Sequence, residues 1–558
     1  MQTHTVLNQA KSLIDYNMFG ADLVLQDLVQ RYEAGWANDL LVSFGEFAGS
    51  EQAIVWAQQA NDNEPVFHSH DRFGNRIDKV EYHPAYHELM RKSVEFSVHS
   101  LPWTDSRAGA HVARAAMMYM AFQNEAGHCC PISMTYSVVP SLRLQPDLAL
   151  NWEPLITSRV YDSRYIPNTE KNGLIMGMAM TEKQGGSDVR ANTTRAVPEG
   201  LGGPGKAYRL TGHKWFCSAP MSDGFLMLAQ AERGLSCFLV PRFEPYGTKN
   251  KIFVQRLKGK LGNKSNASSE IELEGALAWL VGEEGRGVPT IIEMVNHTRL
   301  DCILGASALM RQASLQALHH CHNRAAFGKL LSQQNLMMNV LADISLEAEG
   351  ASRLMMRVAA AYDQQSESED EKLFKRIGSA IAKYWVCKRA PLQVAEALEC
   401  LGGNGYVEAG PMARLFRESP LLGIWEGSGN VICLDVMRAV AKEPETLEAF
   451  VAELDRSAGQ SRRLDAHFSS VKDEVMAMKN AFASKDIAAM EVCELTARRF
   501  VERLALALEA ALLVRQAPDA VAEAFVSSRL DRDGGFALGT LNSSAADLKQ
   551  MLARYYPF

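Results

Sequence analysis

The sequence lacks a paired-cysteine framework, a long hydrophobic run and a leader-like start. Its ten cysteines include no C-x-x-C spacing, which favours free buried thiols in a reducing compartment over disulfides. No stretch reaches the roughly 18 apolar residues of a membrane-spanning helix. The first residues, Met1 to Val6, lack the basic segment and the following apolar run that a secretory signal has. We therefore expect a cytoplasmic protein with no membrane partner.

An excess of positive charge is also missing. The chain carries 58 Lys and Arg against 65 Asp and Glu, so nothing in its net charge of -7 attracts nucleic acid. From residue 441 onward the balance is 15 Lys and Arg against 18 Asp and Glu. DNA stays open as a partner through local patches, although solvated helix surface is the favoured interpretation of these arginines: Arg462, Arg463, Arg498, Arg499 and Arg503.

What is present is the composition of a folded protein of several domains. Over 558 residues, 47% are hydrophobic and 22% are charged, which excludes disordered and fibrous classes. The hydrophobic period is helical to about residue 165 and becomes strand-like in the middle of the chain. We predict a helical domain over 1–173, a β domain over 174–285, a four-helix bundle over 286–441 and a further helical domain over 442–558.

The middle region contains short strand-like runs separated by Gly, Pro, Asn or Ser, with no dozen-residue helices between them. This pattern disfavours a parallel dinucleotide-binding sheet and favours an antiparallel barrel or sandwich. Helical runs follow over 303–318, 336–362, 373–398 and 430–440, with a polar loop expected over 363–372. The expected fold class is therefore a multidomain α+β protein.

The segment from Met176 to Val189 places a hydroxyl, two glycines, a serine and an aspartate directly after an apolar run. Glycines let backbone N–H groups approach a ligand closely, and Thr181 and Ser187 add hydroxyl groups. Trp215 ends a predicted strand and could cover one face of a heterocycle. The pattern indicates a site for a flat polar heterocycle or a phosphate, with a plain surface turn and core packing as the alternatives.

One carboxylate, Glu426, stands between apolar residues and glycines just before a helix. Desolvation would raise its pKa toward values useful to a general base, although a helix-capping or surface glutamate is the simpler alternative. His319 and His322 lie one helical turn apart, but two such ligands without carboxylates fall short of a usual site. We predict no metal.

Together these segments resemble the acyl-CoA dehydrogenase family in order and spacing over about residues 80–440. The amino-acid sequences of 180–189, 261–267 and 424–430, with the extra C-terminal helical region, are similar to those of the AidB-like subgroup. That subgroup is associated with the response to DNA alkylation. The fold that this resemblance implies agrees with the domains predicted above. The motifs that carry it are Thr181-Glu182, Gly185-Gly186-Ser187-Asp188, Trp215, Arg324-Ala325-Ala326-Phe327-Gly328, Gly402-Gly403-Asn404-Gly405-Tyr406 and Trp425-Glu426-Gly427-Ser428.

The resemblance implies a bound FAD. Its flavin half would be held by Met178, Met180, Thr181, Gly186, Ser187, Trp215, Phe216 and Cys217. Its adenine half, often reached from a neighbouring subunit in the family, would be held by Arg324, Phe327, Gly402, Gly403, Ser428 and Asn430. Trp425 is a further residue implied to bind the cofactor. A guanidinium such as that of Arg324 suits a pyrophosphate, because it presents a fixed fork of donors to phosphate oxygens.

The resemblance further implies α,β-dehydrogenation of an acyl-CoA thioester with Glu426 as the base and Arg299 near the substrate. The backbone N–H of Glu426 would help to stabilise enolate charge, in the manner of an oxyanion hole. A homotetramer and an electron-transferring flavoprotein as acceptor are implied as well. The sequence differs from the family pattern at four positions. Cys217, Ser218, Asn296 and Glu399 stand where many members have Thr, Asn, Asp and Gln. These differences leave the identity of the substrate undetermined and imply a weak dehydrogenase activity.

Three hypotheses follow. The first is an FAD-dependent dehydrogenase of acyl-CoA type, linked to alkylation damage. The second is a flavin-containing, DNA-binding or protective protein whose dehydrogenase chemistry is vestigial. The third, a flavin monooxygenase, is disfavoured because such enzymes do not need Glu426.

Overall fold

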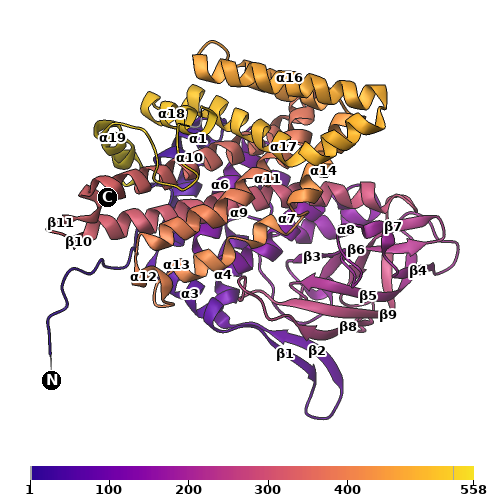
Figure 1. Ribbon diagram of the computed structural model, residues 1–558. Helices are drawn as coiled ribbons and strands as arrows, with labels where there is room; N and C mark the ends of the chain where they lie inside the picture. The colour runs from indigo at the N-terminus through magenta and orange to yellow at the C-terminus, as the bar shows by residue number, and fades with distance from the viewer. Residues whose placement is uncertain (1–2, 532) are drawn as a thin grey trace. The chain divides into compact units, whose positions relative to one another are not determined.

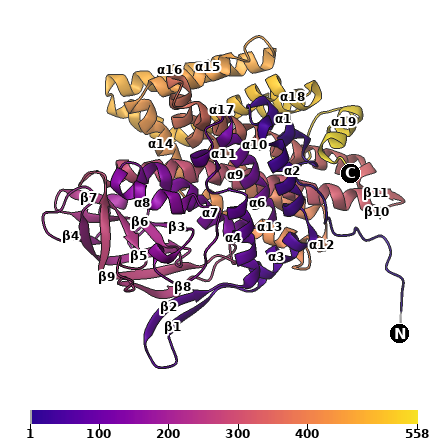
Figure 2. The same cartoon turned by 180° about the vertical axis from the view of Figure 1, so that it is seen from behind.

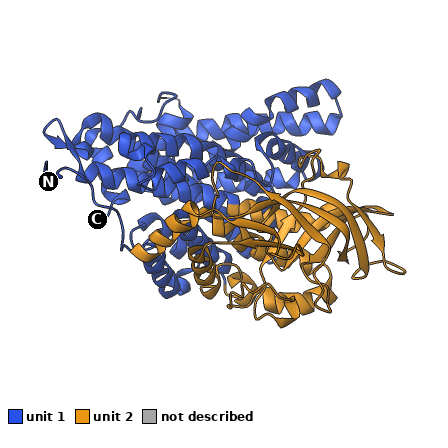
Figure 3. Ribbon diagram, turned by 90° about the horizontal axis from the view of Figure 1, so that it is seen from below, with its two compact units in different colours: residues 1–50, 108–123, 302–558 blue, residues 51–107, 124–301 orange. Residues whose placement is uncertain are grey.

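The computed structural model describes residues 3–531 and 533–558. The chain forms two compact units, coloured separately in Figure 3. Unit 1 comprises 1–50, 108–123 and 302–558, whereas unit 2 comprises 51–107 and 124–301. Each unit is thus assembled from segments that are distant in sequence. The four predicted domain boundaries remain predictions, because these units follow spatial compactness rather than chain order.

Unit 2 contains a seven-stranded sheet in the order β3-β6-β4-β5-β9-β7, with β8 pairing with β9 and β6 also pairing with β7. Most pairings are antiparallel, as expected for the central β domain, but β3–β6 and β4–β6 are parallel. The long connections between these strands permit parallel pairing. The strands are β3 (Met176–Ala179), β4 (Arg195–Pro198), β5 (Ala207–Ser218), β6 (Gly224–Ala231), β7 (Gly234–Pro241), β8 (Ile252–Leu257) and β9 (Ser268–Val281).

The helices of unit 2 include α4 and α7, and α7 contacts both β3 and α4 (Figures 1 and 2). Pro131 and Pro140 lie inside α7 without ending it. The sheet packs around a buried cluster that includes Phe225, Phe238 and Leu273. The helices are α3 (Glu51–Asp62), α4 (Pro84–Glu95), α5 (Leu101–Thr104), α7 (Ala126–Leu142) and α8 (Pro146–Ile156).

A β-hairpin interrupts the region that the sequence predicts as helical. Its strands β1 (Val66–His70) and β2 (Arg76–Glu81) pair antiparallel. Asp71 Oδ1 accepts the backbone N–H of Phe73 at 2.8 Å and of Asn75 at 2.9 Å, and Gly74 has a φ of +85°. An aspartate that bonds its own backbone and a glycine in the left-handed region are typical turn signals. The N-terminal region is therefore not purely helical, contrary to the prediction from the sequence pattern.

Unit 1 is helical, and α10 packs against α11, α17 and α19. Helix α6 (Ala110–Asn124) lies in unit 1 apart from its last residue, and α9 (Gly287–Asn323) begins in unit 2 and continues into unit 1. The remaining helices are α1 (Leu23–Arg31), α2 (Asn38–Ala48), α10 (Asn335–Gln364), α11 (Glu369–Glu399), α12 (Gly403–Tyr406), α13 (Met412–Glu418), α14 (Gly429–Lys442), α15 (Glu445–Asp455), α16 (Arg462–Ser484), α17 (Ile487–Gln516), α18 (Asp519–Phe525) and α19 (Ala545–Tyr555).

The four predicted bundle helices are confirmed, since each lies within α9, α10, α11 or α14. The predicted loop over 363–372 is too long, because α10 runs to Gln364 and α11 begins at Glu369. The side chain of Ser368 caps α11, and three acidic residues fill its first turn. Their negative charges interact favourably with the positive end of the helix dipole. Helix α17, which follows the predicted boundary at 442, packs against α10, α11 and α14.

All ten cysteines are free and buried, as the sequence predicts. Among the described residues, no helix combines the length and the apolar character that crossing a membrane requires. Buried thiols of this kind act as small hydrophobic side chains. Burial raises the pKa of several of them; for Cys237 the value is about 12.

Candidate functional site

Two of the predicted flavin segments lie against each other in unit 2. The carbonyl of Thr181, just beyond β3, accepts the backbone N–H of Trp215 in β5 at 2.8 Å. The carbonyl of Met180 accepts the side-chain amide of Asn192 at 2.9 Å, and the N–H of Lys183 donates to His213 Nε2 at 3.0 Å. Residues 178–187 and 215–217 are therefore brought together by the sheet, although 34 positions separate Thr181 from Trp215.

A fully buried ion pair fixes the same junction. Glu182 and Lys214 have no exposed side-chain surface, and Lys214 Nζ lies 2.9 Å from Glu182 Oε1. Glu182 also accepts the backbone N–H groups of Thr193 and Thr194. Burial favours the neutral acid, but the charge and hydrogen bonds of Lys214 outweigh it, so the pKa of Glu182 lies well below its usual range. Sequence reasoning missed the pair, whose only signal is that its members adjoin Thr181 and Trp215.

The glycine-rich loop closes tightly on Thr181. A Cβ added to Gly186 would lie 2.5 Å from Thr181 Oγ1, so the loop requires a glycine there. Ser187 is exposed, whereas Thr181 and Met178 are half-buried. Backbone N–H groups and two hydroxyls are thus available beside Trp215, which fits the polar edge of a flavin or a phosphate.

Trp215 lies under a cluster of cations. Lys258 Nζ is 3.5 Å from the centroid of the Trp215 ring and 4.6 Å from that of Phe216, which is 48% exposed. Lys258 also pairs with Glu270 at 2.8 Å. A cation over an indole face is attracted by the ring quadrupole, so Lys258 orients Trp215. Lys258 was not among the predicted residues, because strand spacing alone does not place it over the ring.

Cys217 and Arg299 are the other predicted residues of unit 2. The Cys217 side chain belongs to the buried core of the sheet, and burial raises the pKa of its thiol to about 12. Its carbonyl accepts the hydroxyl of Ser269 at 3.0 Å. Arg299, in α9, is 7% exposed. Because it is buried and its pKa is raised, the Cys217 thiol is a packing group at neutral pH rather than a nucleophile.

The predicted base lies in unit 1, between a short 3₁₀ turn (Leu421–Gly423) and α14. Glu426 has a φ of +57° and Gly427 has a φ of +105°. Lys383 Nζ donates to the carbonyl of Gly427, which helps to hold this backbone in place. A non-glycine residue in the left-handed region costs free energy and is concentrated at functional sites. Glu426 and Trp425 are half-buried, whereas Ser428 and Asn430 at the start of α14 are exposed.

Arg324 precedes a two-residue hairpin formed by β10 (Ala325–Ala326) and β11 (Lys329–Leu330). Phe327 at its tip is 99% exposed with a φ of +52°. Arg324 Nη1 donates to the carbonyl of Asn8 at 2.9 Å, and Asn8 Oδ1 accepts the N–H of Ala325 at 2.7 Å. The N-terminal segment therefore already bonds Arg324, the residue predicted to bind the pyrophosphate. The sequence did not reveal this contact.

The glycines at 402 and 403 lie near the same N-terminal segment. Gly402 has a φ of +59° and precedes α12, and both glycines are exposed. Gln9 Oε1 accepts the side-chain amide of Asn404 at 3.3 Å and lies 3.5 Å from Arg324 Nη1. Residues 8–9 thus connect two of the predicted adenine-binding segments of unit 1.

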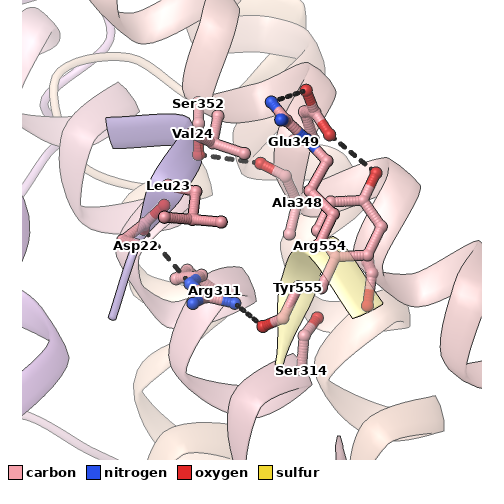
Figure 4. A pocket seen from close by; sticks show the side chains of 11 residues that line it. Asp22, Leu23, Val24, Arg311, Ser314, Ala348, Glu349, Ser352, Arg554 and Tyr555 are labelled. Carbon is pink, nitrogen blue, oxygen red and sulfur yellow. Dashed lines mark hydrogen bonds and ion pairs between the residues drawn. The ribbon is translucent and has the colours of Figure 1, made fainter. Parts of the chain in front are cut away.

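A small polar cavity in unit 1 does not fit a substrate (Figure 4). It encloses about 10 Å³, which is room for a single water molecule. Arg311 pairs with Asp22 at 3.1 Å, and Tyr555 Oη donates to Glu349 at 2.7 Å across its wall. The cavity is a buried polar network that a water can complete.

Four of the five arginines named above for the C-terminal region have acidic or polar partners. Arg463 pairs with Glu523 and with Asp531, and Arg503 lies 2.7 Å from Glu474. Arg499 lies 3.7 Å from the same glutamate, and Arg498 donates to Tyr384 Oη at 3.2 Å. Such pairing weakens the attraction of these residues for phosphates.

The histidine cluster is occupied by aromatic and backbone contacts. His322 stacks on Tyr556 with centroids 4.4 Å apart, and His319 Nδ1 lies 3.1 Å from Tyr556 Oη. Within residues 3–531 and 533–558, no group of three or more His, Cys, Asp or Glu side chains could hold a metal ion. These contacts account for the two histidines structurally.

Three family models match the chain. The adaptive response protein AidB N-terminal domain matches residues 8–163, the acyl-CoA dehydrogenase middle domain matches 177–276, and the acyl-CoA dehydrogenase C-terminal domain matches 285–441. The three matches follow the order of the predicted helical, β and bundle regions.

Similar proteins cover nearly the whole chain. "Putative acyl-CoA dehydrogenase AidB" of Escherichia coli (strain K12) is 42% identical over 96% of each chain. "Acyl-CoA dehydrogenase family member 11" of Caenorhabditis elegans is 30% identical over 78% of this chain and 72% of its own. The crystal structure of Caenorhabditis elegans ACDH-11 in complex with C11-CoA superimposes with a TM-score of 0.82 at 25% identity, covering 99% of this chain and 93% of that one.

Proposed function

Because this chain belongs to the acyl-CoA dehydrogenase family, we propose that it is an FAD-dependent oxidoreductase that desaturates an acyl-CoA thioester between the α and β carbons. The observation that carries this proposal is the hydrogen bond from Trp215 to Thr181, which joins the two flavin segments. When bound, FAD would accept the hydride from the β carbon. The remaining chemistry is that of the chain's own residues.

The cofactor site is proposed from the surroundings of Thr181 and Trp215. The Gly186 loop supplies N–H groups, and the buried pair of Glu182 and Lys214 holds that loop in register. Lys258 fixes the indole of Trp215, so the ring can act as a rigid wall. Met178, Met180, Ser187, Phe216 and the backbone of Cys217 complete the proposed flavin half, and Arg324 with the segments at 402–403 and 425–430 would hold the adenine half.

Glu426 would remove the α-proton. A carboxylate can do so only if the thioester oxygen is hydrogen-bonded as charge develops, and the backbone N–H of Glu426 is one candidate donor. The left-handed backbone at Glu426, followed by Gly427, supports this role, because such strain persists where the surroundings impose a functional geometry. Arg299 is proposed to lie near the substrate end.

The experiment compares the wild-type protein with Glu426→Gln. Anaerobic mixing of flavin-loaded wild type with straight and branched acyl-CoAs should bleach the visible flavin band. The variant should keep the band and lose about 10²- to 10⁴-fold in bleaching rate, as expected when a general base is removed. Flavin-loaded wild type that is bleached by no thioester, or a variant that reacts at the wild-type rate, would refute the enzymatic proposal.

Several finer properties belong to the same proposal. The acyl-CoA substrate is supported by the similarity to the ACDH-11 complex with C11-CoA. By family resemblance we also propose a homotetramer, a cytoplasmic location and an electron-transferring flavoprotein as acceptor. Sedimentation of the purified protein tests the tetramer directly, since a stable monomer would contradict it.

A role in the adaptive response to DNA alkylation is proposed from the match of residues 8–163 to the AidB N-terminal domain. A deletion strain should lose survival after methylation, and the wild-type gene should restore it. Complementation with Glu426→Gln then tells whether the dehydrogenase chemistry is needed. The alternative of a DNA-binding protein with vestigial chemistry is not favoured, because Arg463 and Arg503 are paired with acids.

A further inference from the structure

Unit 2 contains a second cavity of about 350 Å³ that is partly open to solvent, and this volume is within the range of small-molecule sites. Its wall is formed by the end of β2, by α4, by residues 161–175 and by the turn between β5 and β6. None of the residues assigned above to the flavin or the thioester lines it. The proposed flavin and thioester sites therefore do not account for this cavity.

Two phenols in this wall, Tyr82 and Tyr86, make no hydrogen bond through their hydroxyls to the described part of the chain. Tyr82 is 8% exposed and Tyr86 is 4% exposed, and their rings stack with centroids 4.5 Å apart. Within residues 3–531 and 533–558, no hydrogen bond reaches either hydroxyl, and both oxygens are accessible to solvent. Both hydroxyls can therefore donate to or accept from a molecule that enters the cavity, with water as the partner when no ligand is bound.

The charges around the cavity are compensated. Lys171 Nζ lies 2.7 Å from Asp223 Oδ1, and Arg164 pairs with Asp162 at 2.6 Å. His87 shares a hydrogen bond of 2.9 Å with Tyr161 Oη, and burial lowers the pKa of His87, which favours the neutral imidazole at pH 7. The two other charged lining residues, Lys79 and Glu81, are exposed and opposite in sign, so the lining carries no net positive charge and suits an uncharged molecule.

The wall is also preformed. Arg242 Nε donates to the carbonyl of Ser222 at 2.8 Å, and its Nη2 donates to that of Pro220, which fixes the turn between β5 and β6. Tyr165 Oη donates to the carbonyl of Ile77 at 3.1 Å and holds residues 161–175 against β2. A ligand would therefore bind without first paying to order these segments.

We propose that this cavity binds an uncharged aromatic molecule of one or two rings that carries a hydrogen-bonding group, with the hydroxyls of Tyr82 and Tyr86 as its polar partners. Aromatic side chains in the wall provide flat faces for such a ring. A purely aliphatic ligand would leave both hydroxyls unpaired. A charged ligand would add an uncompensated charge to a neutral wall.

The test is a calorimetric titration of the full-length protein with indole, 1-methylindole and indole-3-carboxylate. Indole should bind at millimolar or lower concentration. The methylated probe lacks the N–H donor and should bind about five- to tenfold more weakly, the equivalent of one net hydrogen bond. The carboxylate should show no saturable binding. Absence of binding by indole, or tighter binding by the carboxylate, would overturn the proposal.

Variants locate the binding. Tyr82→Phe and Tyr86→Phe should each weaken indole binding by up to about tenfold and leave 1-methylindole unchanged. Tyr246→Phe is the matched control, since Tyr246 is 98% exposed and does not line the cavity, so the loss of its hydroxyl should not change indole affinity. A thermal unfolding scan confirms that each variant is folded. Indole affinity that is equal in the wild type and in both test variants would overturn the assignment to this cavity, whatever the outcome of the flavin experiment.

Discussion

The two units hold their proposed functional residues by different physical means. In unit 2, the segments around Thr181 and Trp215 are distant in sequence and are joined by strand register and by a fully buried ion pair. In unit 1, Glu426 is positioned by a short turn with left-handed backbone beside the first residues of α14. We expect single substitutions to disturb a site whose segments are held together by strand register. A site held by a turn depends instead on the few residues that form the turn.

The largest effect is expected at Lys214. Lys214→Met leaves Glu182 charged, buried and without its cation, which should cost about 3–5 kcal/mol of unfolding free energy. Urea unfolding followed by circular dichroism measures the loss, and flavin content should fall with it.

The matched controls for this variant are Lys206→Met, at an exposed position, and the double variant Glu182→Gln with Lys214→Met. The first should be nearly neutral, and the second should recover part of the loss because no bare charge remains. A single variant as stable as wild type would show that the pair does not hold the loop.

The next effect concerns pH in unit 1. Burial, together with the nearby Glu347, raises the pKa of Glu509 to about 8. The folded state then keeps a proton that the unfolded state releases above about pH 4.5, so this group's contribution falls as the pH rises from about 4.5 to 8. The total is on the order of 4 kcal/mol, at 1.36 kcal/mol for each pKa unit.

Glu509→Gln should remove this decline, because a neutral amide can still accept the bond that Trp385 Nε1 makes to Glu509 Oε2 at 2.9 Å. Denaturation midpoints at pH 5 and pH 8 make the comparison. Identical pH profiles for the variant and the wild type would contradict the raised pKa.

Unit 2 should respond to pH in the opposite direction through Glu125. Burial alone would raise its pKa, but bonds from His128 and Ser265 outweigh it and lower the pKa to about 2. Stability from this group is present above about pH 4.5 and is lost as the pH falls toward 2, by about 2 kcal/mol at pH 3. Glu125→Gln should show a flatter acid limb in urea unfolding between pH 3 and 7, and an unchanged limb would contradict this assignment.

The smallest effect is expected at the surface of unit 1. Arg463 pairs with Glu523 and Asp531, but its side chain is 44% exposed and theirs are 62% and 40% exposed. Exposed pairs contribute little, so Arg463→Ala should change the unfolding free energy by less than about 0.5 kcal/mol. A loss above about 1.5 kcal/mol in the same unfolding assay would mean that this pair is more than solvated helix surface.

The helices of the bundle could be predicted because their hydrophobic periodicity is long and their ends are marked, as at Ser368 before α11. The hairpin of β1 and β2 was missed because each strand has only five or six residues and carries no strong apolar alternation. The motifs at 181–188 and 425–430 were recognisable as sequence. The partners of two other predicted residues were not recognisable, because no spacing rule connects Lys258 to Trp215 or Asn8 to Arg324.

The sequence by itself determined the local elements and the residue types of the candidate site, since hydrophobic period, glycines and helix caps act over a few positions. Only the tertiary structure decided which side chains meet across long separations. The pairing of Glu182 with Lys214 and the cavity at Tyr82 and Tyr86 arise from strand register and packing, which depend on the whole sheet and its neighbouring helices rather than on any local pattern.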